Sequence, residues 1–146
     1  MKQGKRVGLL DADIFGPSIP KLMGLEGKKA NISESGLFIP LRQYGIQVMS
    51  MGFLMENPDA AIVWRGLMVM KAIERLVRLI DWSPLDVLFI DMPPGTGDTQ
   101  LSICQLCILN GAVIVSTPQD VALIDVRKGI DMFGKVGVKV KNHLEL

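Results

Sequence analysis

Two short apolar runs that end in aspartate constrain the fold of this chain more than any other feature. They are Arg6–Asp11 and Val87–Asp91, and a third apolar run covers Ala112–Ser116. Runs of this length predict strands that are buried on both faces, as in parallel sheets. Helical periodicity over Leu67–Asp81 and Asp120–Val136 alternates with these strands. The alternation predicts an α/β fold whose parallel sheet binds ligands at the carboxyl ends of its strands.

Shorter elements are predicted from local patterns between these runs. We expect a helical turn near Ile19–Leu25, a hairpin formed by Leu37–Leu41 and Gly45–Met51, a helix over Thr99–Leu109 and a strand beginning at Val138–Val140.

The composition excludes several classes of protein. The chain has 146 residues, a formal net charge of +1 and 49% hydrophobic residues, which fits one globular domain and gives no basic surface for nucleic acid. The uncharged stretch Thr99–Gln119 is long enough to span a bilayer, but polar residues interrupt it, so we expect no membrane insertion. Two cysteines are too few for a disulfide scaffold, and no signal peptide follows the basic start, so we expect a reducing compartment.

Two carboxylates flank the end of the first predicted strand, at Asp11 and Asp13. One could hold a water of a Mg²⁺ ion while the other orients an attacking water. In the alternative interpretation this is a capped loop, in which Asp13 or Ser18 caps the following turn.

The run Val87–Asp91 has the Walker B pattern of four apolar residues followed by aspartate, which places a carboxylate beside a phosphate-bound Mg²⁺. The loop after it, Met92–Asp98, can turn sharply and present backbone N–H groups to a γ-phosphate. The alternative is a plain strand end followed by a turn.

Taken together, these motifs and their flanking sequences resemble the Mrp/ApbC family of P-loop ATPases, which carry iron–sulfur clusters. The amino-acid sequences of several segments most resemble those of the NUBPL branch of that family, which is mitochondrial and serves assembly of respiratory complex I. The resemblance runs from Lys5 to Val140 and rests on Leu10–Ser18, Tyr44–Leu54, Trp64–Met70, Asp91–Asp98 and Gly111–Asp120.

The resemblance implies a three-layer α/β P-loop NTPase fold of the deviant-Walker-A, MinD-like kind. It places Asp11 near the Mg²⁺ shell, Asp13 at the hydrolytic water and Asp91 as the Walker B aspartate. It also implies a switch II loop formed by Pro94, Gly95, Thr96, Gly97 and Asp98, and a nucleotide-base side formed by Thr117, Pro118, Gln119 and Asp120. Trp64, Arg65 and Gly66 are interpreted as a dimer or switch contact, or as a buried tryptophan beside a surface arginine.

Two defining parts of the family are not found in the sequence. Its Lys-Gly-Gly-Val-Gly-Lys phosphate loop precedes the switch I aspartates, where this chain has only Met1–Gly4, and its Cys-x-x-Cys pair follows the matched region. We therefore expect residues 1–146 to be a partial nucleotide-binding domain that lacks the P-loop strand and the C-terminal part, with an unmatched tail at 141–146. Cys104 and Cys107 have metal-ligand spacing, but they fall in a predicted apolar helix, so we interpret them as structural and expect no metal ligands in this chain.

The function that the resemblance implies is ATP-dependent assembly or transfer of [4Fe–4S] clusters, with ATP and Mg²⁺ as further ligands. In this family the partners are a second copy of the full-length protein and iron–sulfur recipient apoproteins. We expect the chain alone to be a poor ATPase, and the mitochondrial matrix as its location, with the cytoplasm as the alternative. Two other functions stay open: a non-catalytic truncated product or partner-binding module, and a MinD- or ParA-like ATPase without a cluster.

Overall fold

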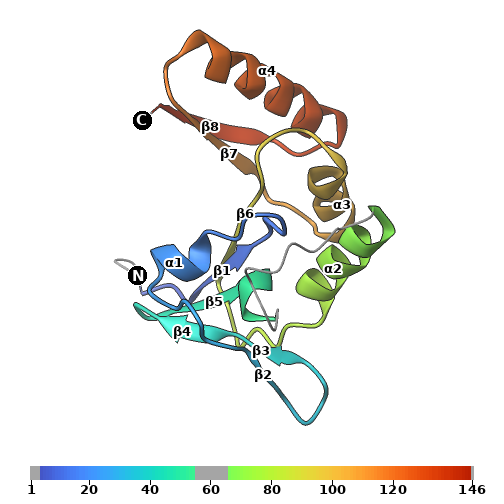
Figure 1. Cartoon of the computed structure of the whole chain (residues 1–146). Coiled ribbons are helices and arrows are strands. Elements are labelled where there is room, and N and C mark those ends of the chain that lie inside the picture. Colours follow the sequence, from blue (N-terminus) through green and yellow to red (C-terminus); the bar gives the residue numbers. More distant parts are fainter. Residues whose placement is uncertain (1–3, 55–65, 146) are drawn as a thin grey trace. The chain divides into compact units, whose positions relative to one another are not determined.

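The computed structural model describes residues 4–54 and 66–145. The chain forms two compact units, residues 1–93 and 94–146, where the sequence predicts one partial domain (Figure 1). We call them the N-terminal unit and the C-terminal unit and describe each by itself.

A four-stranded sheet forms the centre of the N-terminal unit. Its strands are β1 (Val7–Asp11), β4 (Leu41–Gln43), β5 (Ile46–Ser50) and β6 (Val87–Asp91), in the order β4-β5-β1-β6. Strand β1 pairs in parallel with both β5 and β6, as the apolar runs predict, whereas β4 is antiparallel to β5.

The hairpin of β4 and β5 is shifted relative to its prediction. Its first strand is Leu41–Gln43 rather than Leu37–Leu41, and Gln43 pairs with Ile46 across a two-residue turn. The turn residues Tyr44 and Gly45 have φ values of 50° and 76°, as a type I′ turn requires. Tyrosine is rare at positive φ, so the sequence gives little sign of this turn.

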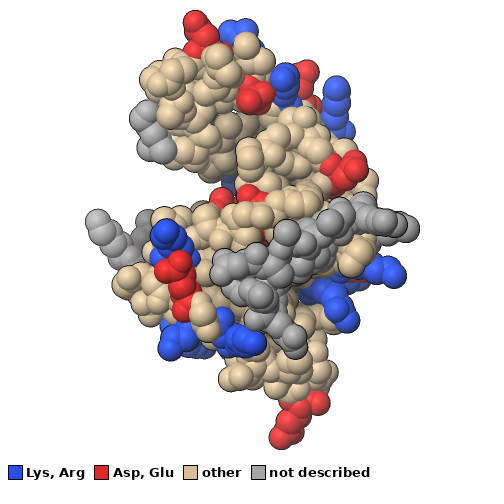
Figure 2. Space-filling model, viewed as in Figure 1, with Lys and Arg blue, Asp and Glu red and all other residues tan. Residues whose placement is uncertain are grey.

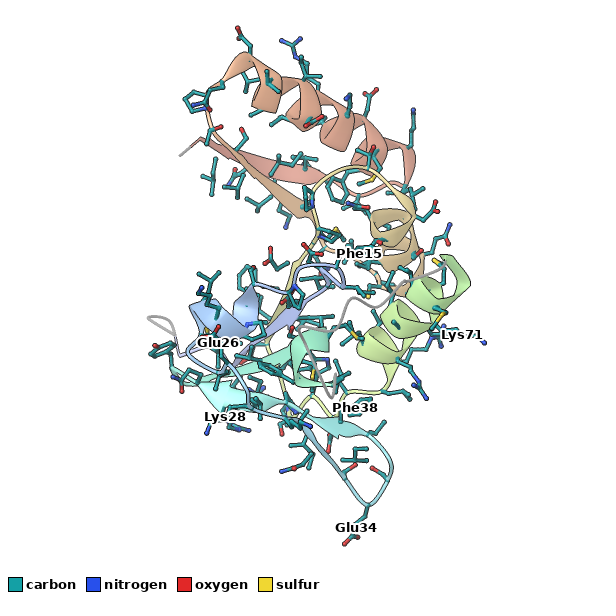
Figure 3. The ribbon with its side chains drawn as sticks, viewed as in Figure 1. Phe15, Glu26, Lys28, Glu34, Phe38 and Lys71 are labelled. Carbon is teal, nitrogen blue, oxygen red and sulfur yellow. The ribbon has the colours of Figure 1, made fainter. Side chains whose placement is uncertain are left out.

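A small antiparallel pair, β2 (Asn31–Ile32) and β3 (Phe38–Ile39), was not predicted as a pair. Glu34 lies at the tip of the turn that joins these two strands (Figure 3).

The described residues of the N-terminal unit also form the helical segments α1 (Ile19–Leu22), the 3₁₀ turn η1 (Met51–Phe53) and α2 (Gly66–Arg78). The buried face of α2 includes Val69, Ala72, Ile73 and Leu76, with the i, i+3, i+4, i+7 spacing of an amphipathic helix. Met68 and Leu79, which the sequence places on this face, are exposed because the face is centred on Ile73.

The C-terminal unit contains α3 (Asp98–Leu106), β7 (Ala112–Ser116), α4 (Asp120–Lys135) and β8 (Val140–Glu145). Strands β7 and β8 pair in parallel, and α4 runs along this pair as the crossover between them (Figure 1). The segment 141–146, which was expected to be an unmatched tail, contributes residues 141–145 to β8. Among the described residues, no helix is both long and apolar enough to span a bilayer.

The prediction that β6 and β7 are buried on both faces is wrong. Phe89 of β6 is 57% exposed and Val115 of β7 is 54% exposed. Within the described residues, β6 is the last strand of its sheet and β7 has β8 as its one strand partner. An edge strand has fewer neighbours than an internal strand, so an apolar run alone overestimates its burial.

Candidate nucleotide and cation site

The carboxyl ends of three parallel strands place Asp11, Ser50 and Asp91 at one level of the sheet. Asp11 is the register partner of Ser50 in β5 and of Asp91 in β6. The prediction that both strand-terminal aspartates lie at the same edge of the sheet is confirmed. Asp13 follows two residues after β1, so three carboxylates belong to this edge.

The carboxylate of Asp11 is fully buried and accepts hydrogen bonds on both oxygens. Its Oδ1 accepts the N–H of Asp13 at 3.1 Å. Its Oδ2 accepts the Ser50 hydroxyl at 3.0 Å and the N–H of Ile19 at 3.3 Å. Asp11 therefore fixes the loop that leads from β1 to α1.

Ser50 is a site residue that the sequence motifs do not single out. It is fully buried, and its Oγ also accepts the N–H of Gly52 at 3.1 Å, which caps the η1 turn. The only sign of Ser50 in the sequence is its position at the end of a predicted strand, two residues before Gly52. Nothing in that pattern specifies that its partner is a carboxylate 39 residues earlier in the chain.

Asp13 belongs to the loop after β1 and is half-buried. Its Oδ1 accepts the N–H groups of Phe15 at 3.1 Å and Gly16 at 3.2 Å, which is a local Asx turn. Asp13 therefore caps its own loop, as one interpretation of the sequence expects, whereas the Ser18 side chain makes no capping bond. Oδ2 of Asp13 accepts no hydrogen bond from the described residues, so the water-orienting role of Asp13 stays a prediction. Phe15 extends from the same loop and is 65% exposed (Figure 3).

The electrostatics of this edge favour a cation. Burial raises the pKa of Asp11, hydrogen bonds from Ser50, Asp13 and Ile19 oppose that rise, and the charge of Asp91 adds to it. Burial also raises the pKa of Asp91, and the charge of Asp13 adds to this effect. Carboxylates that repel one another in this way are stabilised by a bound cation.

The donor set fits Mg²⁺ held together with a nucleotide. Among the described residues, no three or more His, Cys, Asp or Glu side chains converge closely enough to bind a metal by themselves. Nucleotide-bound Mg²⁺ needs only one or two carboxylates, because phosphate oxygens and water complete its shell. Asp91 and Asp13, which are partly exposed, suit this requirement better than the enclosed Asp11.

The predicted switch II loop lies in the C-terminal unit. Gly95 has a φ of 99°, the carbonyl of Pro94 accepts the Gln100 amide at 3.1 Å, and Gly97 is the N-cap of α3. Asp98 begins α3. Thr96 lines a hollow of about 340 Å³ together with Leu101 and residues of α4. The loop is ordered by α3, and its role as a phosphate sensor stays a prediction.

The predicted nucleotide-base residues Thr117, Pro118, Gln119 and Asp120 are exposed and join β7 to α4. Gln119 is the N-cap of α4, and its carbonyl accepts the N–H of Leu123 at 3.0 Å. The Gln119 side chain makes no capping hydrogen bond. Contact between these residues and a nucleotide base stays a prediction. Trp64 and Arg65 lie outside the described residues, and Gly66 is the first residue of α2.

A hollow of about 370 Å³ lies at the opposite end of β1 from the carboxylates. Gly4, Lys5, Arg6, Arg42 and Gly45 are among the residues that line it. Its position at the amino ends of β1 and β5 separates it from the aspartate edge, so it is not part of the candidate site.

The family model of the ParA-type NUBPL iron-transfer P-loop NTPases matches residues 1–145. The mouse "Iron-sulfur cluster transfer protein NUBPL" is 60% identical over 136 residues, which are 93% of this chain and 42% of that protein. The Arabidopsis thaliana "Iron-sulfur protein required for NADH dehydrogenase, mitochondrial" is 51% identical over 96% of this chain and 44% of its own length. The chain thus spans less than half the length of these relatives.

A solved structure supports the same fold. A nucleotide-binding protein of Archaeoglobus fulgidus in complex with ADP is 42% identical, with a TM-score of 0.80 over 99% of this chain and 55% of that one. The predicted P-loop NTPase fold and the predicted resemblance are both confirmed. On its sequence, its fold and its family model, this chain belongs to the NUBPL iron-transfer P-loop NTPase family.

Proposed function

We propose that this chain supplies the carboxylates of the nucleotide site in an iron–sulfur cluster transfer NTPase. These carboxylates contact the Mg²⁺ ion of the nucleotide and orient the attacking water. The observation that carries the proposal is the meeting of Asp11 and Asp91 in register at the carboxyl edge, with Asp13 on the adjoining loop. The similarity to NUBPL proteins supports the same assignment.

Each aspartate has its own role in this proposal. Asp91 would contact the Mg²⁺ ion or its water, and Oδ2 of Asp13, the oxygen not used in the Asx turn, would orient the attacking water. Asp11 is enclosed, so it acts through its charge and through the loop that it holds in place. When bound, Mg²⁺ neutralises charge that develops on the phosphate oxygens.

Phosphate binding needs further groups. Residues 1–146 contain no Lys-Gly-Gly-Val-Gly-Lys loop, and positioning with charge stabilisation provides nearly all of phosphoryl-transfer catalysis. We therefore propose that these residues by themselves hydrolyse ATP poorly. Switch II at Pro94–Asp98 and the base side at Thr117–Asp120 contribute only when the phosphates are held.

The relatives support proposals for the cargo and the location. We propose a [4Fe–4S] cluster as the cargo, recipient apoproteins that include complex I subunits, and a homodimer as the working form. Identity is 60% and 56% with the NUBPL proteins of mouse and Dictyostelium discoideum, against 46% with the Escherichia coli carrier. This difference supports the mitochondrial matrix rather than the bacterial cytoplasm.

A chimaera tests the proposed function. Residues 5–140 of this chain replace the matching segment of the mouse relative, and iron, sulfide and activation of an apo-recipient are measured after anaerobic reconstitution. We expect loading and transfer comparable to those of the mouse protein. ATP hydrolysis without cluster loading would support the MinD- or ParA-like alternative, and a folded chimaera with neither activity would support a non-catalytic product.

A further inference from the structure

Cys104 and Cys107 occupy the carboxyl end of α3, and both are free, half-buried thiols. Cys104 lies within the helix, and Cys107 is its C-cap residue. The N–H of Cys107 still donates to the carbonyl of Ile103 at 2.9 Å, so the last turn of the helix is intact. The two cysteines are therefore neighbours on one side of the helix, as residues at i and i+3 are.

From this arrangement we infer that Cys104 and Cys107 form a reversible intramolecular disulfide, which makes the end of α3 an oxidation site. Because the backbone is helical through Leu106, the α-carbons of Cys104 and Cys107 lie about 5 Å apart, within the roughly 4.4–6.8 Å that a disulfide spans. A disulfide also needs Cβ atoms about 3.5–4.5 Å apart, so closure requires a rotation of Cys107 toward Cys104.

The end of the helix permits that movement. Cys107 already has extended backbone angles, with φ −121° and ψ 140°, and the helix does not continue beyond Leu106. Ile108, the next residue, is 99% exposed. Cys107 can therefore shift toward Cys104 at the cost of one backbone hydrogen bond, to Ile103, rather than of a whole turn.

The reaction is thiol–disulfide exchange with a low-molecular-mass disulfide such as oxidised glutathione. One cysteine thiolate attacks that disulfide, forms a mixed disulfide and releases the first glutathione as its thiol. The second cysteine, after losing its proton, attacks the protein sulfur and releases the second glutathione. The two protein thiols lose two electrons, which reduce the glutathione disulfide, and both protons end on the released thiols.

Burial of the two thiols makes the exchange slow. It raises the pKa of both thiols, and Cys107 raises that of Cys104 further, so the attacking thiolate is scarce at neutral pH. This pair is therefore suited to slow oxidation rather than to rapid catalytic cycling.

Intact-mass spectrometry and thiol alkylation of the full chain in glutathione buffers test this inference. Because the chain has 2 cysteines, a monomer can form only one internal disulfide. In oxidising buffer we expect the loss of two hydrogen masses, no alkylated thiol and full reversal by dithiothreitol. Cys104→Ser and Cys107→Ser should instead each take up one glutathione or form a disulfide-linked dimer.

Two results would overturn the inference: two glutathiones bound to each intact chain, or two alkylatable thiols in buffer that glutathionylates the single variants. If the variants do not fold, the mass of the oxidised unmodified chain decides alone. Neither readout depends on nucleotide or cluster binding, so the outcome is independent of the proposed function.

Discussion

The hydroxyl of Ser50 donates a hydrogen bond to Oδ2 of Asp11 across 3.0 Å, and both residues are fully inaccessible to solvent. This bond joins the carboxyl ends of β5 and β1. A buried carboxylate without donors is costly, so Ser50, Ile19 and Asp13 together make the charge of Asp11 tolerable at this position. The candidate site therefore depends on a serine as well as on its aspartates.

Replacing Ser50 with alanine should destabilise the N-terminal unit. The change leaves the Asp11 carboxylate with one donor fewer, and a hydrogen bond to a charged group contributes about 1.5–3 kcal/mol. Urea unfolding measures the loss. Ser18→Ala is the matched control, because Ser18 is exposed and its side chain makes no capping bond. Equal free energies of unfolding for the two variants would show that the Ser50 hydroxyl does not stabilise the fold.

Asp86→Asn should weaken the chain at neutral pH and have less effect in acid. Arg6 donates to both oxygens of Asp86, at 2.9 and 3.1 Å, and holds the pKa of that carboxyl well below its usual range. The contribution of Asp86 to stability is therefore present above the usual aspartate pKa of about 3.9 and declines as the pH falls below it.

Unfolding free energies at about pH 7 and about pH 3 measure this difference. Asp81→Asn serves as the control, because Asp81 forms no ion pair with the described residues. A gap between wild type and Asp86→Asn that stays constant with pH would contradict the assignment.

Asp91→Asn should change the free energy of unfolding in the opposite direction to Asp86→Asn and stabilise the chain at neutral pH. The pKa of Asp91 is raised by burial and by the charge of Asp13, so the folded chain binds the proton more tightly than the unfolded chain. Its ionisation costs stability as the pH rises through the raised pKa, and asparagine removes that cost. The gain should vanish below about pH 3.9, the usual aspartate pKa. A variant that is less stable than wild type at neutral pH would refute this account of Asp91.

Gly8→Ala should destabilise β1 by overpacking. A Cβ at Gly8 would lie 2.6 Å from Cδ1 of Leu85 and 3.0 Å from Cζ3 of Trp82. Overpacking of this kind costs about 1–3 kcal/mol. In contrast, a Cβ at Gly134 of α4 meets no atom within 4 Å, so Gly134→Ala should gain about 0.5–1 kcal/mol of helix stability. Circular dichroism during thermal unfolding compares the two, and equal transitions would contradict the expected contrast.

The strongly apolar elements of this fold are predictable from the sequence. The predicted bounds of β6 and β7 match the structure, and those of β1 and α4 differ by a single residue. These segments have uninterrupted apolar runs or a sustained helical period, so local pattern determines them. The placement of Asp11 and Asp91 at the carboxyl edge of the sheet follows, because parallel strands end at the same edge.

Other features depend on contacts between distant parts of the chain. The bond from Ser50 to Asp11 needs the register of β5 on β1, which no local pattern encodes. The turn at Tyr44 needs positive φ in a residue that seldom adopts it. The exposure of Phe89 depends on which strand lies next to β6, and pattern alone predicts an internal strand.

Figure 2 shows acidic and basic side chains interspersed over the visible face, in keeping with the net charge of +1. The attraction of a cation to the candidate site would therefore arise from its local carboxylates rather than from the field of the whole protein.

The Mg²⁺ dependence of ATP hydrolysis by the chimaera described above tests the central claim most directly. We predict that Asp91→Asn raises the Mg²⁺ concentration needed for half-maximal rate by at least about tenfold, the scale on which loss of a partner weakens metal sites. Asp81→Asn, outside the site, should leave it unchanged. The same Mg²⁺ requirement in wild type and Asp91→Asn would contradict the claim that this aspartate edge handles the cation of the nucleotide.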